Sequence, residues 1–256
     1  MREKIHAAPT LVYPESDGEP MAETPKHQQV MIDCMDMLRS HFRGLPDVYI
    51  AGNMLMYYEE GNPRKSISPD VFMVRGLSKK ELRTYKTWEQ PPTLDFVLEV
   101  AIPSTYTRDF NEKMEIYAKI LKVKAYCIYD PYHEIDPYFI GFRLVGETYE
   151  EIPFVNDRLP FTVLGLEFGE RDGALRLYDP VKSAWLLTSQ ERVAQEALAR
   201  QEAESRVVQE LLTRQEAESR VEQEARVRQA AESRAQHAEA ELEKLRAALQ
   251  RLKTTE

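Results

Sequence analysis

Apolar side chains recur at helical spacing in the first recognisable element of the chain, "TPKHQQVMIDCMDMLRSHF" at residues 24–42. The apolar positions three or four residues apart are Val30, Met31, Cys34, Met35, Leu38 and Phe42. This spacing predicts an amphipathic helix. Thr24 suits the N-cap position and Pro25 the first helical position.

Three runs rich in β-branched and aromatic residues follow, separated by Gly, Asn and Pro signals. They are "DVYIAGNMLMYYEEG" at 47–61, "ISPDVFMVRG" at 67–76 and "TLDFVLEVAIPS" at 93–104. Each run predicts a strand. In the second run, Pro69 lacks an amide donor and Asp70 is a poor strand former, so the pair is expected at the entrance or edge of its strand.

The helical period returns in "RDFNEKMEIYAKILKV" at 108–123, where Asp109 and Glu112 resemble a capping box. "KAYCIYDP" at 124–131 then predicts a buried strand, and segments 138–154 and 161–180 predict two β-hairpins. The order is helix, three strands, helix, strand. This order predicts an α/β fold, specifically an α+β mixed sheet with helices on its faces.

After Trp185 the chain contains no glycine, proline or aromatic residue, which predicts one long helix. "RQEAESRV" occurs at 200–207 and 214–221, and the related "RQAAESRA" at 228–235. This two-heptad period favours a coiled coil that joins copies of the chain into a homo-oligomer. The apolar seam is uneven, however, because Arg200, Arg214 and Arg228 interrupt it before a leucine-rich end at Leu242, Leu245, Leu249 and Leu252. A solvated single helix held by Glu/Arg pairs is the alternative.

We therefore expect an N-terminal extension at 1–23, an α/β domain at 24–187 and a helical tail at 188–256. The composition supports a packed core, with 43% hydrophobic residues, while the net charge of −9 gives no global basic field for a polyanion. Cys34 and Cys127 are expected to be reduced, packed thiols of a cytoplasmic protein. No secretory signal or membrane span is recognisable.

Two strand carboxylates stand out as candidate chemistry. Asp70 opens one strand, and Glu99 lies within the apolar "FVLEVA", where a buried and unpaired carboxylate is costly. A solvent-facing position on an alternating strand would also accommodate Glu99. The short "IPSTYTRD" connection brings Lys113, in the first turn of the next helix, towards the same strand end. Two carboxylates suit Mg²⁺, and an ammonium beside them can orient or help deprotonate an attacking water.

These segments resemble a known protein family. "SPD", "FVLEVAIPSTYTRDFNEKMEIYA" and "KAYCIYDP" are similar to the bacterial Uma-two family of restriction-endonuclease-like proteins, within the PD-(D/E)xK nuclease superfamily. The resemblance extends over roughly residues 24 to 180 and implies a restriction-endonuclease-like αβββαβ core. By this resemblance Asp70 and Glu99 bind Mg²⁺ or Mn²⁺, with the Val100 carbonyl as a further ligand, and the substrate is DNA.

The match departs from the superfamily pattern at one position. The superfamily lysine normally stands two residues after the acidic residue, where this chain has Ala101. The Uma-two pattern places it on the following helix, and Asp109, Lys113 and Tyr117 reproduce that spacing. Lys113 is thus the third catalytic candidate, with an exposed helix lysine as its alternative. Asp109 is interpreted as a helix cap and Tyr117 as a core residue.

Scattered basic residues either line a DNA cleft or serve solubility alone; they are Arg64, Lys65, Lys79, Lys80, Arg108, Lys119, Lys122 and Lys124. His133 is discounted as a ligand because its Pro-punctuated segment suggests turn chemistry. The favoured function is a Mg²⁺-dependent endonuclease with Asp70, Glu99 and Lys113 as catalytic residues. The alternative is a weakly active or inactive nuclease fold that serves as an assembly or nucleic-acid-binding module. A glycosidase-like acid pair ranks last because it leaves Lys113 unexplained.

Overall fold

The structure, a computed structural model, describes residues 12–16, 24–78, 81–91 and 93–253. Two compact units are distinguished, Met1–Arg192 and Val193–Glu256. The first unit is a mixed α/β domain and the second is helical. The sequence places the start of the tail at residue 188, but Glu191 and Arg192 still bind residues of the domain, namely Arg176 and Asp36.

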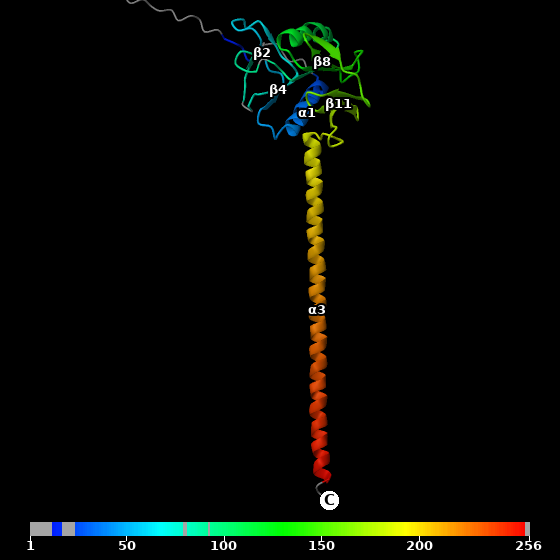
Figure 1. The fold of residues 1–256 in the computed structure, drawn as a ribbon. Helices are drawn as coiled ribbons and strands as arrows, with labels where there is room; N and C mark the ends of the chain where they lie inside the picture. The colour runs from blue at the N-terminus through cyan, green and yellow to red at the C-terminus, as the bar shows by residue number, and fades with distance from the viewer. Residues whose placement is uncertain (1–11, 17–23, 79–80, 92, 254–256) are drawn as a thin grey trace, which may run out of the picture. The chain divides into compact units, whose positions relative to one another are not determined.

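A six-stranded mixed sheet forms the centre of the domain (Figure 1). Its strands, in spatial order, are β1 (Val48–Ala51), β4 (Val71–Arg75), β6 (Phe96–Val100), β7 (Ala125–Tyr129), β8 (Phe139–Val145) and β9 (Thr148–Glu151). β6 and β7 are parallel, and the other neighbouring pairs are antiparallel. Every residue of β6 and β7 is buried, as expected for central strands that are covered on both faces. The predicted mixed α/β fold is confirmed.

Two of the three predicted strand runs are each divided between two sheets. The run at 47–61 gives β1 and then β2 (Met56–Tyr57), and the run at 67–76 gives β3 (Ser66–Ile67) and then β4. β2 pairs with β3 and with β5 (Tyr85–Lys86) in a separate three-stranded sheet. The first break follows Gly52, where Asn53 has a positive φ of 49° that ends the extended chain. Pro69 and Asp70 lie between β3 and β4, at the predicted strand entrance.

Helix α1 (Pro25–His41) begins as predicted, with Thr24 as its N-cap. The Thr24 hydroxyl accepts the backbone N–H of His27 at 3.2 Å, and Pro25 occupies the first turn. The crossover between β6 and β7 is helical and consists of α2 (Tyr106–Arg108), η1 (Asp109–Lys113) and η2 (Ile116–Ile120), the last two with π-helical turns. The predicted capping box at Asp109 is wrong, because the helix begins three residues earlier and Asp109 has helical dihedral angles within it.

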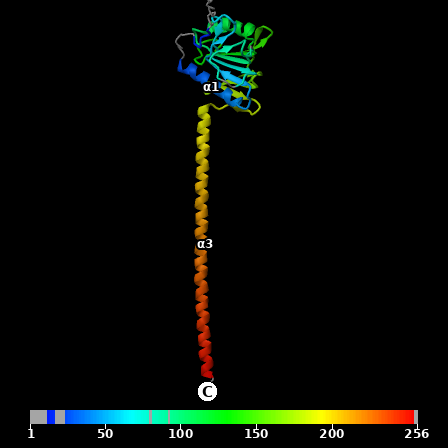
Figure 2. The ribbon, with the colours of Figure 1, turned by 90° about the vertical axis from the view of Figure 1, so that its left-hand side faces the viewer.

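Each face of the central sheet is covered by one helical element and one small sheet. On one face lie α1 and the four-stranded sheet of β10 (Arg158–Phe161), β11 (Leu166–Arg171), β12 (Ala174–Asp179) and β13 (Ala184–Trp185). On the other lie the crossover helix and the three-stranded sheet. Figure 2 shows the strands of the domain with α1 alongside. Both predicted hairpins are present, as β8–β9 and β11–β12.

The predicted N-terminal extension is described only at residues 12–16, which pack on the three-stranded sheet. The ring of Tyr13 lies edge-on to Tyr57 with 4.9 Å between centroids, and the Tyr57 hydroxyl donates to the carbonyl of Pro14 at 2.6 Å. Tyr13 also contacts Trp88. Residues 12–16 therefore contribute to the domain surface.

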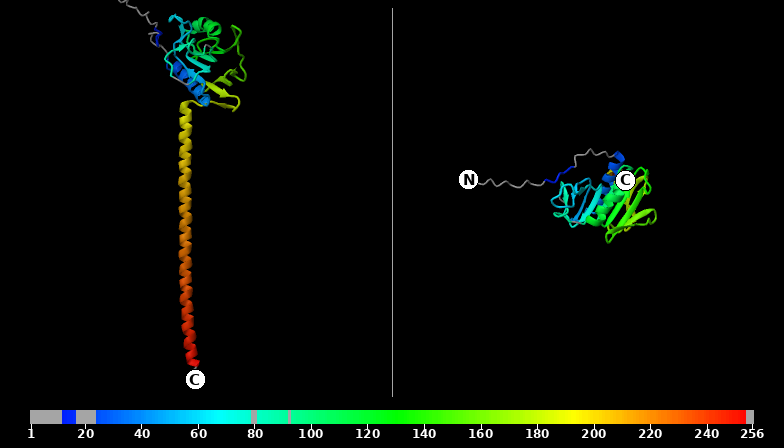
Figure 3. Two further views of the ribbon diagram at one scale, coloured as in Figure 1. Left: turned by 60° about the vertical axis from the view of Figure 1, so that its left-hand side comes forward. Right: turned by 90° about the horizontal axis from the view of Figure 1, so that it is seen from above.

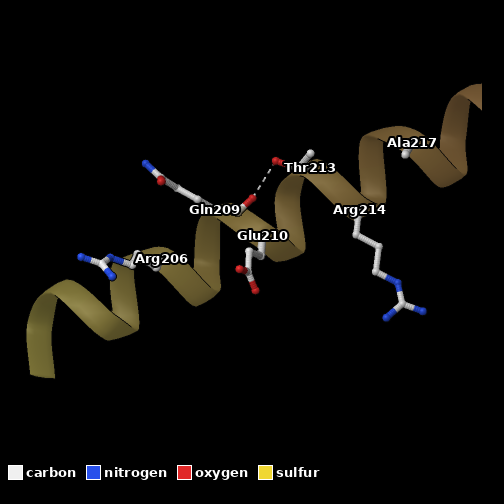
Figure 4. Close-up of a pocket in the computed structure, with 6 residues that line it drawn as sticks. All are labelled: Arg206, Gln209, Glu210, Thr213, Arg214 and Ala217. Atoms are coloured by element: carbon white, nitrogen blue, oxygen red, sulfur yellow. Dashed lines mark hydrogen bonds between the residues drawn. The ribbon is translucent and has the colours of Figure 1, made fainter.

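Helix α3 (Ser189–Lys253) confirms the predicted long helix and runs without a break over 65 residues (Figure 3). At 1.5 Å per residue it extends about 98 Å. Its described side chains beyond Arg192 are all exposed, and Arg200, Arg214 and Arg228 pair with glutamates one turn ahead. Figure 4 shows six side chains of this one helix, from Arg206 to Ala217, with the Thr213 hydroxyl donating to the Gln209 carbonyl at 2.9 Å. The side chains of Leu249 and Leu252 lie outside the described part, and the coiled coil stays a prediction.

None of the helices in the described residues combines the length and the apolar character that crossing a bilayer requires. Cys34 and Cys127 are free and buried, and burial raises the pKa of each thiol. The predicted packed thiols are confirmed.

Candidate active site

Glu99 lies near the C-terminal end of β6 and is fully buried. It shares a face of the strand with Val97, which packs against the crossover helix, so the alternation of the strand directs its side chain into that layer. Both carboxylate oxygens have partners there. Lys113 Nζ donates to Oε2 at 2.8 Å, and the Tyr117 hydroxyl donates to Oε1 at 2.5 Å. The solvent-facing interpretation of Glu99 is wrong.

Lys113 projects from η1 towards Glu99 and is only 13% exposed, so its interpretation as a surface lysine is also wrong. Its Nζ atom lies 2.8 Å from Oδ1 of Asp109 as well. Asp109 is thus a buried partner of Lys113. Tyr117 is a core residue, as predicted, but its hydroxyl also serves Glu99.

Asp70 approaches the same place from the adjacent strand. The register pairs Val71 with Leu98, which brings the residue before β4 next to Glu99. Oδ2 of Asp70 accepts the backbone N–H of Val100 at 2.7 Å. Since N–H and C=O of one strand residue point to the same side, the Val100 carbonyl also faces the Asp70 side of β6. The four residues that the sequence singles out, Asp70, Glu99, Val100 and Lys113, therefore come together.

The backbone of Asp70 is held by the chain that leaves β1. A Cβ atom built on Gly52 would lie 2.0 Å from the Asp70 carbonyl oxygen, so only glycine permits this approach. Asn53 donates its backbone N–H to the carbonyl of Pro69 at 3.0 Å. These two contacts join the end of β1 to the start of β4 and restrict the backbone of Asp70.

His27 is the site residue that sequence reasoning missed. It lies in the first turn of α1, is buried, and places Nε2 3.5 Å from Oδ2 of Asp70. A signal was present, because His27 precedes Val30, Met31 and Cys34 at helical spacing and so belongs to the apolar face of α1. A histidine on that face has to meet a polar partner inside the domain.

The electrostatics of the site are dominated by burial and by an excess of acid. Burial raises the pKa of Glu99 to about 8; Lys113 opposes this shift, and the charges of Asp70 and Asp109 add to it. Burial lowers the pKa of Lys113, but the three carboxylates outweigh burial and raise the pKa overall. Lys113 is therefore an ammonium at neutral pH. Asp70, Glu99 and Asp109 thus surround one ammonium, and a cation bound beside them would favour the ionised form of Glu99.

The donor atoms that this site offers are oxygens, the kind that Mg²⁺ prefers. In the described part of the chain no three His, Cys, Asp or Glu side chains form a metal-binding group. Mg²⁺, however, is commonly held by one or two carboxylates together with waters and substrate phosphate, and it does not need a complete protein cage. Asp70 and Glu99, with the Val100 carbonyl beside them, meet that requirement.

Several of the scattered basic residues in the described part of the chain are bound by acidic side chains. Lys119, Lys122 and Lys124 each pair with an acidic residue, namely Glu115, Glu147 and Asp95. Asp95 lies just before β6, whereas Glu99 lies near its other end. Arg64 and Lys65 are exposed before β3, and Lys79 and Lys80 lie outside the described residues. The solubility interpretation therefore fits Lys119, Lys122 and Lys124 best.

The turn chemistry predicted around His133 is confirmed. The Asp130 carboxylate accepts the backbone N–H groups of Tyr132, Glu134 and Ile135. His133 has a positive φ of 58° and contacts Glu170 at 2.8 Å. These contacts shape the β7–β8 loop.

Comparison with known proteins gives a family match over most of the domain. The profile of the Uma2 family, described as "Putative restriction endonuclease", matches residues 5–170, which is well over half of the chain. No curated protein matches. Among solved structures, a protein of Anabaena variabilis ATCC 29413 titled "putative nuclease belonging to DUF820" is similar at 12% identity and a TM-score of 0.40. The alignment covers 54% of this chain and 73% of that one.

Proposed function

Because the chain belongs to the Uma2 family, whose description is "Putative restriction endonuclease", we propose that it is a Mg²⁺-dependent endonuclease that hydrolyses phosphodiester bonds in DNA. The observation that carries this proposal is the convergence of Asp70, Glu99 and Lys113. They come from three separate elements and meet within hydrogen-bonding or ion-pair contacts at one end of β6. Packing alone does not require one buried carboxylate and two largely buried ionisable groups in one place.

Asp70 and Glu99 would hold Mg²⁺ or Mn²⁺ through carboxylate oxygens, with the Val100 carbonyl as a third donor. When bound, the metal polarises the phosphate and lowers the pKa of a coordinated water. Lys113 contributes its positive charge. Its raised pKa keeps it protonated, so it orients the attacking water and stabilises negative charge on the phosphate, and it does not accept the proton of the water.

Asp109 and Tyr117 hold these groups in place. Asp109 binds the ammonium of Lys113 from within the same helix, at 2.8 Å. Lys113 would therefore keep one carboxylate partner if Glu99 were engaged in holding a metal. Tyr117 fixes the other oxygen of Glu99 through its hydroxyl. Neither residue needs to touch substrate.

The tail would join two or more copies of the chain through a coiled coil, so that two sites act on one duplex. The 14-residue repeat and the exposed Leu242 and Leu245 support this assembly. The free, buried Cys34 and Cys127 suit a reducing compartment, and we place the protein in the cytoplasm on that basis.

One observation favours the alternative, a nuclease fold with little or no cleavage activity that serves assembly or nucleic-acid binding. Both oxygens of Glu99 are engaged by side-chain donors, so a metal must compete with Lys113 or Tyr117 for them. A long helix is also common in assembly proteins. The two functions differ in whether the site binds a divalent cation.

The deciding experiment is nicking of supercoiled plasmid in Mg²⁺ or Mn²⁺ by wild type, Asp70→Asn, Glu99→Gln and Lys113→Ala. The matched control is Asp95→Asn, which neutralises another buried carboxylate about 13 Å along the same strand, at 3.3 Å per residue. We expect cleavage by wild type and control and a loss of at least about 100-fold in the three site variants. Equal cleavage by all five proteins would point to a contaminant. Absence of cleavage together with absence of Mn²⁺ binding would favour the assembly function.

A further inference from the structure

His27 is placed by its helix and not by the strands that carry the carboxylates. It lies in the first turn of α1, and its side chain is only 8% exposed. The inner face of α1 is otherwise apolar, with Val30, Met31 and Cys34 buried on it. An imidazole in such a position loses hydration, and this loss needs a compensating polar contact.

The contact lies at Asp70. Nε2 of His27 is 3.5 Å from Oδ2, the same oxygen that accepts the Val100 N–H at 2.7 Å. Two neighbours from different elements thus meet one oxygen of the carboxylate, and Oδ1 takes no part in either contact. The backbone of Asp70 is already fixed against Gly52. Val100, through a hydrogen bond, and His27, through a longer contact, therefore lie against the same oxygen of the carboxylate.

Two hydrogen bonds also hold the first turn of α1 against the end of the sheet where the site lies. The Tyr132 hydroxyl donates to the Thr24 hydroxyl at 2.8 Å, and Lys26 Nζ donates to the carbonyl of Pro131. Both partners belong to the β7–β8 loop, which follows β7 directly beside Val100, since Val100 pairs with Tyr129. The position of His27 is therefore set independently of the rotamer of Asp70.

We propose that His27 is a positioning residue for Asp70 that turns its carboxylate towards a divalent cation. This inference rests on the proposed metal-dependent function. Carboxylates that bind metals are commonly oriented by a second hydrogen-bonding group, and loss of that group typically costs 10–100-fold in metal affinity. His27 acts through Asp70 and need not touch the cation or the phosphate.

The test is Mn²⁺ affinity by titration calorimetry on the full chain freed of metal by chelation. His27→Gln keeps an amide N–H that reaches as far as Nε2, whereas His27→Asn is one methylene shorter. We expect His27→Asn to bind Mn²⁺ 10–100-fold more weakly and His27→Gln to stay within about 3-fold of wild type. His41→Asn is the matched control, because His41 lies on the same helix and contacts Asp179 at 3.8 Å; its affinity should be unchanged.

Equal affinities of wild type and His27→Asn would overturn the inference and leave the metal site standing. Equal weakening in His27→Asn and His27→Gln would also overturn it, because the role would then be one of packing. If wild type itself binds no Mn²⁺, both the inference and the proposed function fail. Far-UV circular dichroism checks that each variant is folded, and His27→Phe replaces His27→Asn if the latter is not.

Discussion

Lys113 and Glu99 form a buried ion pair, with 2.8 Å between Nζ and Oε2, at the junction of the crossover helix and β6. A pair of this kind differs from the exposed Arg/Glu pairs of α3, because neither partner can turn to water when the other is removed. The pair is therefore both a structural element of the domain and the centre of its candidate chemistry. These two roles can be separated by substitution.

Replacing Lys113 by Met should destabilise the domain by about 3–5 kcal/mol, because buried carboxylates lose their cation. The double variant Lys113→Met/Glu99→Gln should recover part of this loss, since it also removes one of the charges. Urea unfolding in the presence of a chelator measures both effects. A cost below about 1 kcal/mol for the single variant, the size expected of an exposed pair, would contradict the burial of Lys113.

Above about pH 8, where Glu99 is ionised, replacing Tyr117 by Phe should cost about 1.5–3 kcal/mol, the range for a hydrogen bond to a charged group. The lost bond is the 2.5 Å contact to Glu99, and the ring itself remains in the core. Tyr149→Phe is the matched control, because it removes a partly buried hydroxyl that donates to the neutral carbonyl of Val123; its cost should be about 1 kcal/mol. Equal costs in the two variants would indicate that the phenol of Tyr117 does not serve the carboxylate.

Replacing Gly52 by Ala should weaken metal binding and cleavage although Gly52 carries no side chain. The new Cβ would lie 2.0 Å from the Asp70 carbonyl oxygen, so the backbone that presents Asp70 must move. Overpacking of this kind costs about 1–3 kcal/mol. Gly44→Ala, where nothing lies within 4 Å of the added atom, is the control and should behave as wild type. Unchanged Mn²⁺ affinity in Gly52→Ala would show that the position of Asp70 is not critical.

The sequence predicts the fold well where periodicity is strong and local. The Thr24 cap, the apolar face of α1, the burial of β6 and β7 and the length of α3 all follow from patterns within one element. The division of residues 47–61 between two sheets cannot be predicted in this way, because a strand pattern does not specify which sheet each half of the run joins. Where the run divides, Gly52 lies against Asp70, a contact between distant parts of the chain that no local pattern specifies.

The candidate site follows the same rule. Asp70, Glu99 and Lys113 are recognisable because each disturbs a local pattern or matches a spacing. His27 and the buried contact of Asp109 are not recognisable in the sequence. Both depend on which side chain the folded chain brings next to them, Asp70 in one case and Lys113 in the other. Asp109 has the sequence signature of a helix cap, and only the earlier start of the helix at Tyr106 places it inside the domain.

The stability of the domain should fall in acid partly through Glu191. Its carboxylate accepts the N–H of Thr188 at 2.8 Å and binds the Arg176 guanidinium at 2.6 and 3.1 Å. Burial raises the pKa of Glu191, but these donors outweigh burial and lower it below the usual 4.5. A lowered pKa stabilises the folded state at pH values above the unfolded pKa, and this contribution is lost as the pH falls through the folded pKa.

Calorimetric melting of wild type and Glu191→Gln between pH 7 and pH 3 measures this contribution. The difference in melting temperature should be largest near neutral pH and should shrink below about pH 4.5, the model-compound range of a glutamate. Glu202→Gln, an exposed position on the same helix, is the control. A difference that does not change with pH would assign the effect of Glu191 to packing.

The tail should determine the oligomeric state of the protein. Leu242 and Leu245 occupy adjacent seam positions of the heptad pattern and are exposed in the single chain, with 54% and 61% of their surface accessible. Charged residues at two such positions oppose coiled-coil association, because each would be buried without a partner. Sedimentation equilibrium should show an oligomer for the full chain and a monomer for Leu242→Asp/Leu245→Asp.

The control is Ala240→Asp/Ala247→Asp, which adds the same two charges on the opposite side of the same helix and should remain oligomeric. A truncated chain ending at Arg192 retains the contacts of Glu191 and Arg192 with the domain and should be a monomer. An unchanged molecular mass in the truncated chain would place association in the domain. If the full chain is itself a monomer, α3 is a solvated helix whose Arg/Glu pairs suffice to hold it, and each protomer presents one candidate site.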